Sequence, residues 1–171
     1  VVQWVHRFTR GWSYAQNIVD PRSGEIIKGH VVLGSLRVRQ DFMIAQGLVP
    51  VQRKGIVDSR PHRALALSRL RQLGAHEVGH ALGIAHNFAA SANQRASVMD
   101  YPYPYVTIDT RGKIDLSQAY AVNIGSWDKL VVRYGYSEFE GNETLALKAI
   151  ITEAETQNLR YVSDQEASSH G

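Results

Sequence analysis

The sequence predicts an α+β domain, and the order of its segments along the chain is the main reason. Runs rich in β-branched and aromatic residues come first, between Val1 and Leu33. Helix-forming segments follow, the longest from Asp58 to Leu82. Strands followed by helices, without regular alternation, are typical of α+β proteins. With 171 residues, of which 44% are hydrophobic, the chain suits one domain, 1–171, around one core.

Three strands are expected in the first third of the chain. Val1 to His6 and Trp12 to Val19 are apolar runs of residues that favour strands. The segment Asp20-Pro21-Arg22-Ser23-Gly24 follows, with Asp and Pro in the first two positions of a type I turn. Ile26 to Leu33 is then the return strand of a hairpin. These strands predict a short N-terminal sheet.

The middle of the chain is expected to hold one long helix. From Leu36 to Val57 no clean period is present, which predicts a loop with a short helix around Asp41 to Gln46. Asp58-Ser59-Arg60-Pro61 offers two N-cap side chains and a proline suited to the first turn. The helix is expected to run to Leu82 and to stop at Gly83. The apolar residues available for its buried side are Leu67, Leu70, Val78 and Ala81.

The last third is expected to form a helical subdomain. Asn87 to Asp115 is irregular and rich in proline and tyrosine. Ser126 can cap a helix that ends at Gly135, and Asn142 can cap another. Apolar residues at helical spacing support both helices: Trp127, Leu130, Val131 and Tyr134 in the first, and Leu147, Ile150, Ile151 and Ala154 in the second.

Composition narrows the classes of partner and ligand. The formal charge of +3 comes from scattered Lys and Arg residues, so no nucleic-acid partner is expected. No apolar run is long enough to span a bilayer. The chain has no cysteine, so any metal must be held by His, Asp, Glu or Tyr. The start Val1-Val2-Gln3-Trp4 has neither an initiating Met nor a signal peptide, which predicts a fragment of a longer protein.

The segment from His76 to His86 predicts a metal centre. Residues four apart share one face of a helix, so His76 and His80 can direct two imidazoles at one ion. His86 lies six residues beyond His80 and reaches the same ion only if the chain turns sharply. Gly83 supplies that turn, because glycine accepts a positive φ without a steric clash. The spacing therefore predicts one Zn²⁺ per chain.

Three histidine ligands leave the fourth position of the zinc open to water, as in catalytic sites. A base that is not itself a ligand is then needed, and Glu77 stands beside His76 for that role. This predicts hydrolysis of peptide bonds by a zinc-activated water with Glu77 as general base. Two alternatives stay open: a zinc hydrolase of another amide, and a catalytically inactive zinc-binding recognition module. Glu77 argues against the second, because a binding site does not need that carboxylate.

The motif His-Glu-x-x-His-x-x-Gly-x-x-His, HExxHxxGxxH, resembles the signature of the metzincin clan of zinc metallopeptidases. The downstream Met-turn of that clan is matched by Ser97-Val98-Met99-Asp100-Tyr101. The resemblance implies a zincin-like catalytic domain in which Met99 forms an apolar floor beneath the histidines. It also implies that Tyr101 is a metal ligand or an oxyanion stabiliser. The alternative for Tyr101 is plain packing in its loop.

The flanks of the motif look like large bacterial zinc metalloproteases of this clan that carry uncharacterised domains on both sides. The segments that carry this resemblance are Trp4–Arg7, Asp20–Ile26, His86–Phe88 and Trp127–Leu130. It implies an endopeptidase acting on a peptide or protein substrate and an extracytoplasmic location. Trp12 to Val19 resembles the edge strand that binds extended substrates, or is an ordinary edge strand. Metzincins have more strands and a backing helix before the active-site helix, so we expect those elements upstream.

Four other histidines, His6, His30, His62 and His170, have no ligand spacing and are expected to be ordinary surface or core residues. Tyr103 and Tyr105 follow the Met-turn, where the resemblance implies the wall of a substrate pocket. Plain loop packing is the alternative for both tyrosines.

Overall fold

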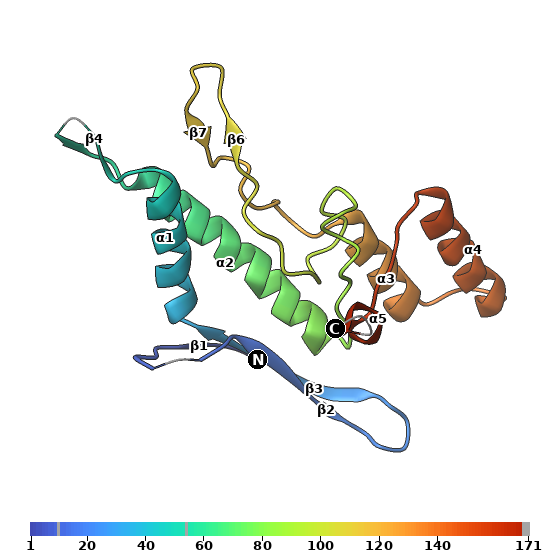
Figure 1. Ribbon diagram of the computed structural model, residues 1–171. Helices are drawn as coiled ribbons and strands as arrows, with labels where there is room; N and C mark the ends of the chain where they lie inside the picture. The colour runs from blue at the N-terminus through green and yellow to red at the C-terminus, as the bar shows by residue number, and fades with distance from the viewer. Residues whose placement is uncertain (10, 54, 169–171) are drawn as a thin grey trace. The chain divides into compact units, whose positions relative to one another are not determined.

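The structure is a computed structural model that describes residues 1–168 except Arg10 and Lys54. The three-stranded sheet comes first and the long helices follow, so the α+β class is confirmed (Figure 1). The chain divides into two compact units, Val1–Gly83 with Tyr103–Asn123, and Ile84–Pro102 with Ile124–Gly171. The assignment of 1–171 to one catalytic domain stays a prediction, as do upstream strands. None of the described helices is long and apolar enough to cross a membrane.

The first unit opens on a sheet in the order β1-β3-β2, formed by β1 (Val2–Val5), β2 (Tyr14–Val19) and β3 (Ile26–Gly34). β2 pairs antiparallel with β3, so the predicted hairpin is confirmed, and β1 pairs parallel with β3. The turn between β2 and β3 closes with a 2.8 Å bond from the Gly24 amide to the Asp20 carbonyl. That bond joins residues four apart in sequence, whereas the bond of a type I turn joins residues three apart. β2 lies at an edge of this sheet.

The loop predicted over Leu36 to Val57 was wrong, and the short helix predicted around Asp41 to Gln46 is part of a longer helix. Most of this segment is the helix α1 (Leu36–Leu48), followed by the short strands β4 (Gln52–Arg53) and β5 (Ile56–Val57). The apolar periodicity is weak because Asp41, completely buried, occupies the inner face with Ala45. Arg37, one turn earlier, donates from Nε to Asp41 Oδ2 at 3.1 Å. An ion pair of which only the Asp41 carboxylate is buried stands where apolar residues would have marked the helix.

α2 (Arg60–Ala81) confirms the predicted long helix, but its buried side was wrongly predicted. Leu67 is 48% and Val78 is 41% exposed. The buried side instead mixes apolar and polar residues: His62, Leu65, Ala66, Arg69, Gln72, Leu73, His76, Glu77 and Gly79. Because polar residues occupy so many inward positions, hydrophobic spacing points to the wrong face. α1 packs along α2 (Figure 1).

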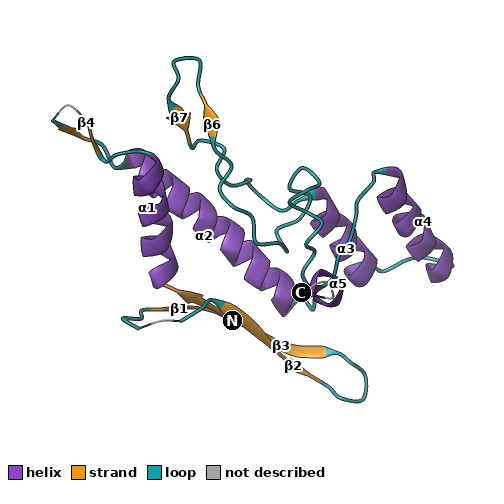
Figure 2. Cartoon of the chain, in the orientation of Figure 1, coloured by secondary structure: helices purple, strands orange, loops and turns teal. Residues whose placement is uncertain are grey.

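The rest of the first unit completes the surroundings of α2. The cluster that closes over α1 and α2 comprises Ala45, Leu65, Leu116, Ala119 and Tyr120. The segment predicted to be irregular contains one short hairpin, β6 (Thr107–Ile108) with β7 (Ile114–Asp115), and is otherwise loop (Figure 2). The last turn of α2 packs closely on β3, because a Cβ at Gly29 would lie 3.0 Å from Ala81 Cβ.

The second unit contains α3 (Ser126–Tyr136), α4 (Glu143–Thr156) and α5 (Asp164–Ser168), of which α5 was not predicted. α3 packs on α4. The Asn142 side chain accepts a 3.2 Å bond from the Leu145 amide, so the predicted cap of α4 is confirmed. The predicted cap of α3 was wrong, since Gly125 takes the N-cap position in place of Ser126.

Candidate metal centre

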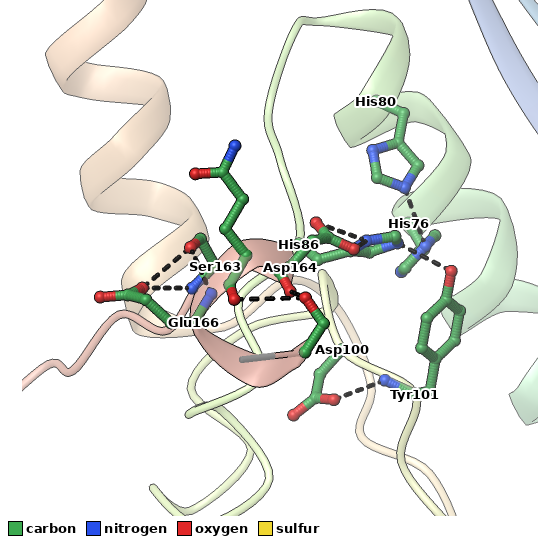
Figure 3. Close-up of polar contacts among 10 residues, drawn as sticks. His76, His80, His86, Asp100, Tyr101, Ser163, Asp164 and Glu166 are labelled. Carbon is green, nitrogen blue, oxygen red and sulfur yellow. Dashed lines mark hydrogen bonds and ion pairs between the residues drawn. The ribbon is translucent and has the colours of Figure 1, made fainter. Parts of the chain in front are cut away.

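The last turns of α2 bring two imidazoles together. The Nε2 atoms of His76 and His80 lie 3.1 Å apart, with ring planes at 89° (Figure 3). Tetrahedral zinc with nitrogen ligands at 2.0–2.1 Å sets neighbouring ligand atoms about 3.3 Å apart. Two ring nitrogens this close share a proton or an ion, because two lone pairs would repel. The pair therefore fits a metal ion with little adjustment.

The turn after α2 has the predicted form. Gly83 has a φ of +79°, and its amide donates to the His80 carbonyl at 2.9 Å. The helix thus ends directly after His80. One ligand atom from each of His76, His80 and His86 lies within 4.8 Å of the others, so these residues form a group that could hold a metal ion. Three neutral imidazoles, without cysteine, are a donor set suited to zinc.

His86 is held on both ring nitrogens by residues of the second unit. Its Nδ1 lies 2.9 Å from Asp164 Oδ1, and its Nε2 lies 2.8 Å from the Tyr101 hydroxyl (Figure 3). The rings of Phe88 and Tyr101 flank the imidazole, with centroids 5.3 and 4.9 Å away. A carboxylate only accepts, so Nδ1 carries the proton and the neutral ring presents its lone pair at Nε2.

Glu77, the predicted base, lies on α2 next to His76 and is only 4% exposed. The same helix buries Arg69, whose guanidinium lies over the Tyr120 ring at 5.5 Å. Burial lowers the pKa of Arg69 and the neighbouring Arg37 adds to this, while the negative charge of Glu77 acts in the opposite direction. Glu77 therefore belongs to a charged, water-poor stretch of α2.

The predicted Met-turn is held in place by hydrogen bonds to Asp128, which lies outside the turn. Asp128 in α3 is 3% exposed, and its carboxylate accepts from the Ser97 hydroxyl at 2.5 Å and from the Val98 amide at 2.8 Å. It also accepts from the Gly125 amide at 2.7 Å. Any Cβ at position 125 would overlap the Ala96 carbonyl, which explains why glycine stands there. Met99 itself is completely buried, and its role as a floor stays a prediction.

Asn87, directly after the third histidine, is completely buried and was not predicted as a site residue. Its Nδ2 donates to the Arg160 carbonyl at 2.9 Å, and its Oδ1 accepts from the Val162 amide at 3.1 Å. Its own amide donates to the Met99 carbonyl at 2.7 Å. Asn87 thus joins the ligand segment to the Met-turn and to the segment before α5. Asn87 and Asp128 lie in the flanking segments His86–Phe88 and Trp127–Leu130, but only the fold shows their contacts.

The remaining residues singled out in the sequence have other surroundings. His62 is buried with Nε2 2.6 Å from the Val49 carbonyl, and His30 Nε2 lies 3.2 Å from Gln3 Oε1, so both have ordinary partners. His6 meets the Trp4 ring edge-on, and His170 lies outside the described residues. Tyr103 is 91% exposed, which argues against loop packing for that side chain. The Tyr105 amide donates to the Ala119 carbonyl at 2.9 Å.

Comparison with known protein families identifies one match. A family model with the description Met-zincin matches residues 58–171, about two thirds of the chain. The matched range includes the three histidines, Glu77, Met99 and Tyr101. Comparisons with curated proteins and with solved structures give no match.

Proposed function

Because the chain belongs to the Met-zincin family, we propose that it is a zinc metalloendopeptidase with Glu77 as its general base. His76, His80 and His86 are the metal ligands in this proposal. The observation that carries it is the 3.1 Å approach of the His76 and His80 ring nitrogens within a three-histidine group. The rigid helix α2 supplies two ligands together with the base.

When bound, zinc lowers the pKa of water to about 7 and polarises the carbonyl group to be attacked. Glu77 accepts the proton of the attacking water and then delivers it to the leaving amine, which restores the carboxylate. Burial of Glu77 at 4% exposure supports this role, since few competing waters reach the carboxylate. Glu77 precedes a ligand on the same helix, so a stiff backbone fixes its distance from the reacting atoms.

Tyr101 also has a role in the proposal, as a donor to the oxyanion. Its hydroxyl donates to His86 Nε2 at 2.8 Å, on the ring nitrogen that a metal would occupy. Once that nitrogen binds a metal, the hydroxyl is released from the imidazole and becomes available to donate to a developing oxyanion. The side chain is 55% exposed, which leaves room for this movement.

The edge strand β2 supports a peptide as substrate. An edge strand offers unpaired backbone groups to which an extended peptide can add. Asn17 in β2 donates from Nδ2 to the His80 carbonyl at 2.9 Å, which fixes the strand to the end of the catalytic helix. A peptide aligned along β2 would therefore lie at a fixed distance from His80.

Replacing Glu77 by glutamine tests the catalytic part of the proposal. Glutamine has nearly the same shape but cannot accept a proton at neutral pH. Glu77→Gln should bind one zinc per chain like the parent, while peptide turnover falls by about 10²–10⁴-fold. Metal analysis and cleavage of a peptide library measure the two quantities. Glu138→Gln, on an exposed segment, is the matched control and should leave both unchanged.

Three results separate the alternatives. Equal turnover of Glu77→Gln and the parent would remove Glu77 as the base. A zinc-loaded parent that cleaves small acyl amides but no peptides would indicate another amide as substrate. A zinc-loaded parent that cleaves neither would favour a recognition module over an enzyme.

A further inference from the structure

The carboxylate of Asp164 and the imidazole of His86 form a contact across a separation of 78 residues in sequence. Both carboxylate oxygens are within reach of Nδ1, at 2.9 and 3.1 Å (Figure 3). The His86 side chain is 17% exposed and that of Asp164 is 61% exposed. The carboxylate thus approaches the ring from the solvent side, on the nitrogen that faces away from Tyr101.

This contact fixes the chemical form of the ring. Nδ1 must donate, because an ionised carboxylate has no proton to give. In the neutral imidazole the lone pair then stands on Nε2, the nitrogen that the Tyr101 hydroxyl contacts at 2.8 Å. The negative charge also stabilises the partial positive charge that a ring acquires when its other nitrogen binds a cation. Asp164 therefore prepares Nε2 as a metal ligand.

The backbone around Asp164 is built to hold this position. The Ser163 amide and hydroxyl both donate to Glu166 Oε2, at 2.8 and 2.9 Å, and this caps α5 at the residue before Asp164. The Val162 amide donates to Asn87 Oδ1 and its carbonyl accepts from the Phe88 amide at 2.9 Å. The segment that carries Asp164 is thus paired with the residues directly after His86. This backbone pairing, and not the reach of a long flexible side chain, holds Asp164 close to His86.

We propose that Asp164 is a positioning residue that holds His86 in the Nδ1-protonated form and strengthens it as a metal ligand. The inference rests on the proposed function, since it assigns a partner to one ligand of the proposed zinc. Loss of such an outer-shell partner typically weakens metal binding by about 10–100-fold. Asp164→Ala should therefore weaken zinc binding by about that factor. Asp164→Asn should weaken it less, because the amide oxygen still accepts from Nδ1 while the charge is gone.

The experiment compares Asp164→Ala, Asp164→Asn and the parent by zinc titration against a competing chelator at constant pH. Glu166→Gln is the matched control, because it removes the same charge from the same helix while its amide oxygen still accepts from Ser163. A second measurement uses the metal-free protein, in which nitrogen NMR of the His86 ring reports which nitrogen carries the proton. The parent should have the proton on Nδ1, and Asp164→Ala should show a mixture. A role limited to the folding of α5 would change melting but would not select a tautomer.

The outcomes are distinct. If Asp164→Ala binds zinc as tightly as the parent, or if Glu166→Gln weakens binding equally, the positioning role is refuted while the proposed function stands. An unchanged His86 tautomer in metal-free Asp164→Ala also refutes it. If the parent itself binds no zinc, the proposed function fails and this inference fails with it.

Discussion

Removal of the Asp128 carboxylate should destabilise the second unit strongly. In Asp128→Ala, the amides of Val98 and Gly125 lose the acceptor that they contact at 2.8 and 2.7 Å. The Ser97 hydroxyl also loses its acceptor, but it can rotate toward another. Each buried donor left without an acceptor costs about 1–3 kcal/mol. Two fully buried donors would give about 2–6 kcal/mol. Because the Val98 contact is buried and the Gly125 contact is part-buried, we take about 4 kcal/mol as the expected loss in the free energy of unfolding.

For a chain of this length, 1 kcal/mol corresponds to about 2–4 °C in the melting midpoint. Asp128→Ala should therefore melt roughly 8–16 °C below the parent in far-ultraviolet circular dichroism. Amide exchange at Val98 and Gly125 would locate the loss in this unit. The control is Asp109→Ala, whose carboxylate accepts from the amides of Arg111 and Lys113, both at 2.8 Å, in an exposed turn. Water replaces that acceptor, so the cost should stay below about 1 kcal/mol.

The comparison isolates burial, because both variants remove a carboxylate that accepts from two backbone amides. Equal melting shifts for the two variants would show that burial of the Asp128 contacts contributes nothing. A shift of Asp128→Ala within about 2 °C of the parent would refute the estimate, since it corresponds to at most about 1 kcal/mol.

Four further predictions concern the metal centre, its helix α2 and the neighbouring helix α1. Tyr101→Phe should keep zinc but slow peptide turnover by about 10²–10³-fold if the hydroxyl stabilises the oxyanion; unchanged kinetics would exclude that role. Met99→Leu should keep zinc and cost less than about 1.5 kcal/mol in thermal melts, because apolar volume is preserved; loss of zinc would contradict this. Gly83→Ala should cost about 1–2 kcal/mol, because φ is +79° and the new Cβ would lie 3.2 Å from Ile26 Cδ1, whereas Gly74→Ala within α2 should stabilise. Burial raises the pKa of Asp41 above its ordinary 3.8, so the protonated carboxyl group is favoured in the folded state. The stability that Asp41 contributes is therefore fully present below pH 3.8 and is lost as pH rises through the raised pKa. Urea unfolding across this range should have a flatter pH dependence in Asp41→Asn, and parallel curves would contradict the assignment.

The three-histidine group could be predicted because local spacing determines its geometry. His76 and His80 share a helix face by the helical repeat, and Gly83 marks the turn that His86 requires. Contacts that support the ligands come from distant parts of the chain, and no local rule encodes them. Asp128 meets Ser97 across 31 residues, and Asp164 meets His86 across 78.

The errors in α1 and α2 have a common physical cause. Hydrophobic spacing assumes that buried positions are apolar, but α1 buries Asp41 and α2 buries Arg69 and His76. The cap of α3 was misplaced for another reason. Ser126 is a good N-cap residue by type, yet the Ala96 carbonyl leaves room only for glycine at the capping position. The local sequence around position 125 gives no sign of this steric exclusion, because Ala96 lies far from it along the chain.

In the proposed zinc site, Asn87 would couple metal binding to a local unfolding equilibrium. Both ends of its amide side chain close on the segment Arg160–Val162, so opening of that segment frees the residue next to a ligand. An ion that binds only the closed form stabilises that form by about 2.7 kcal/mol when it is present at 100 times its Kd. Zinc should therefore slow hydrogen exchange at the amides of Phe88 and Val162 by about a hundredfold. By reciprocity, a substitution that loosens this remote segment would weaken zinc binding without altering any of the three histidines.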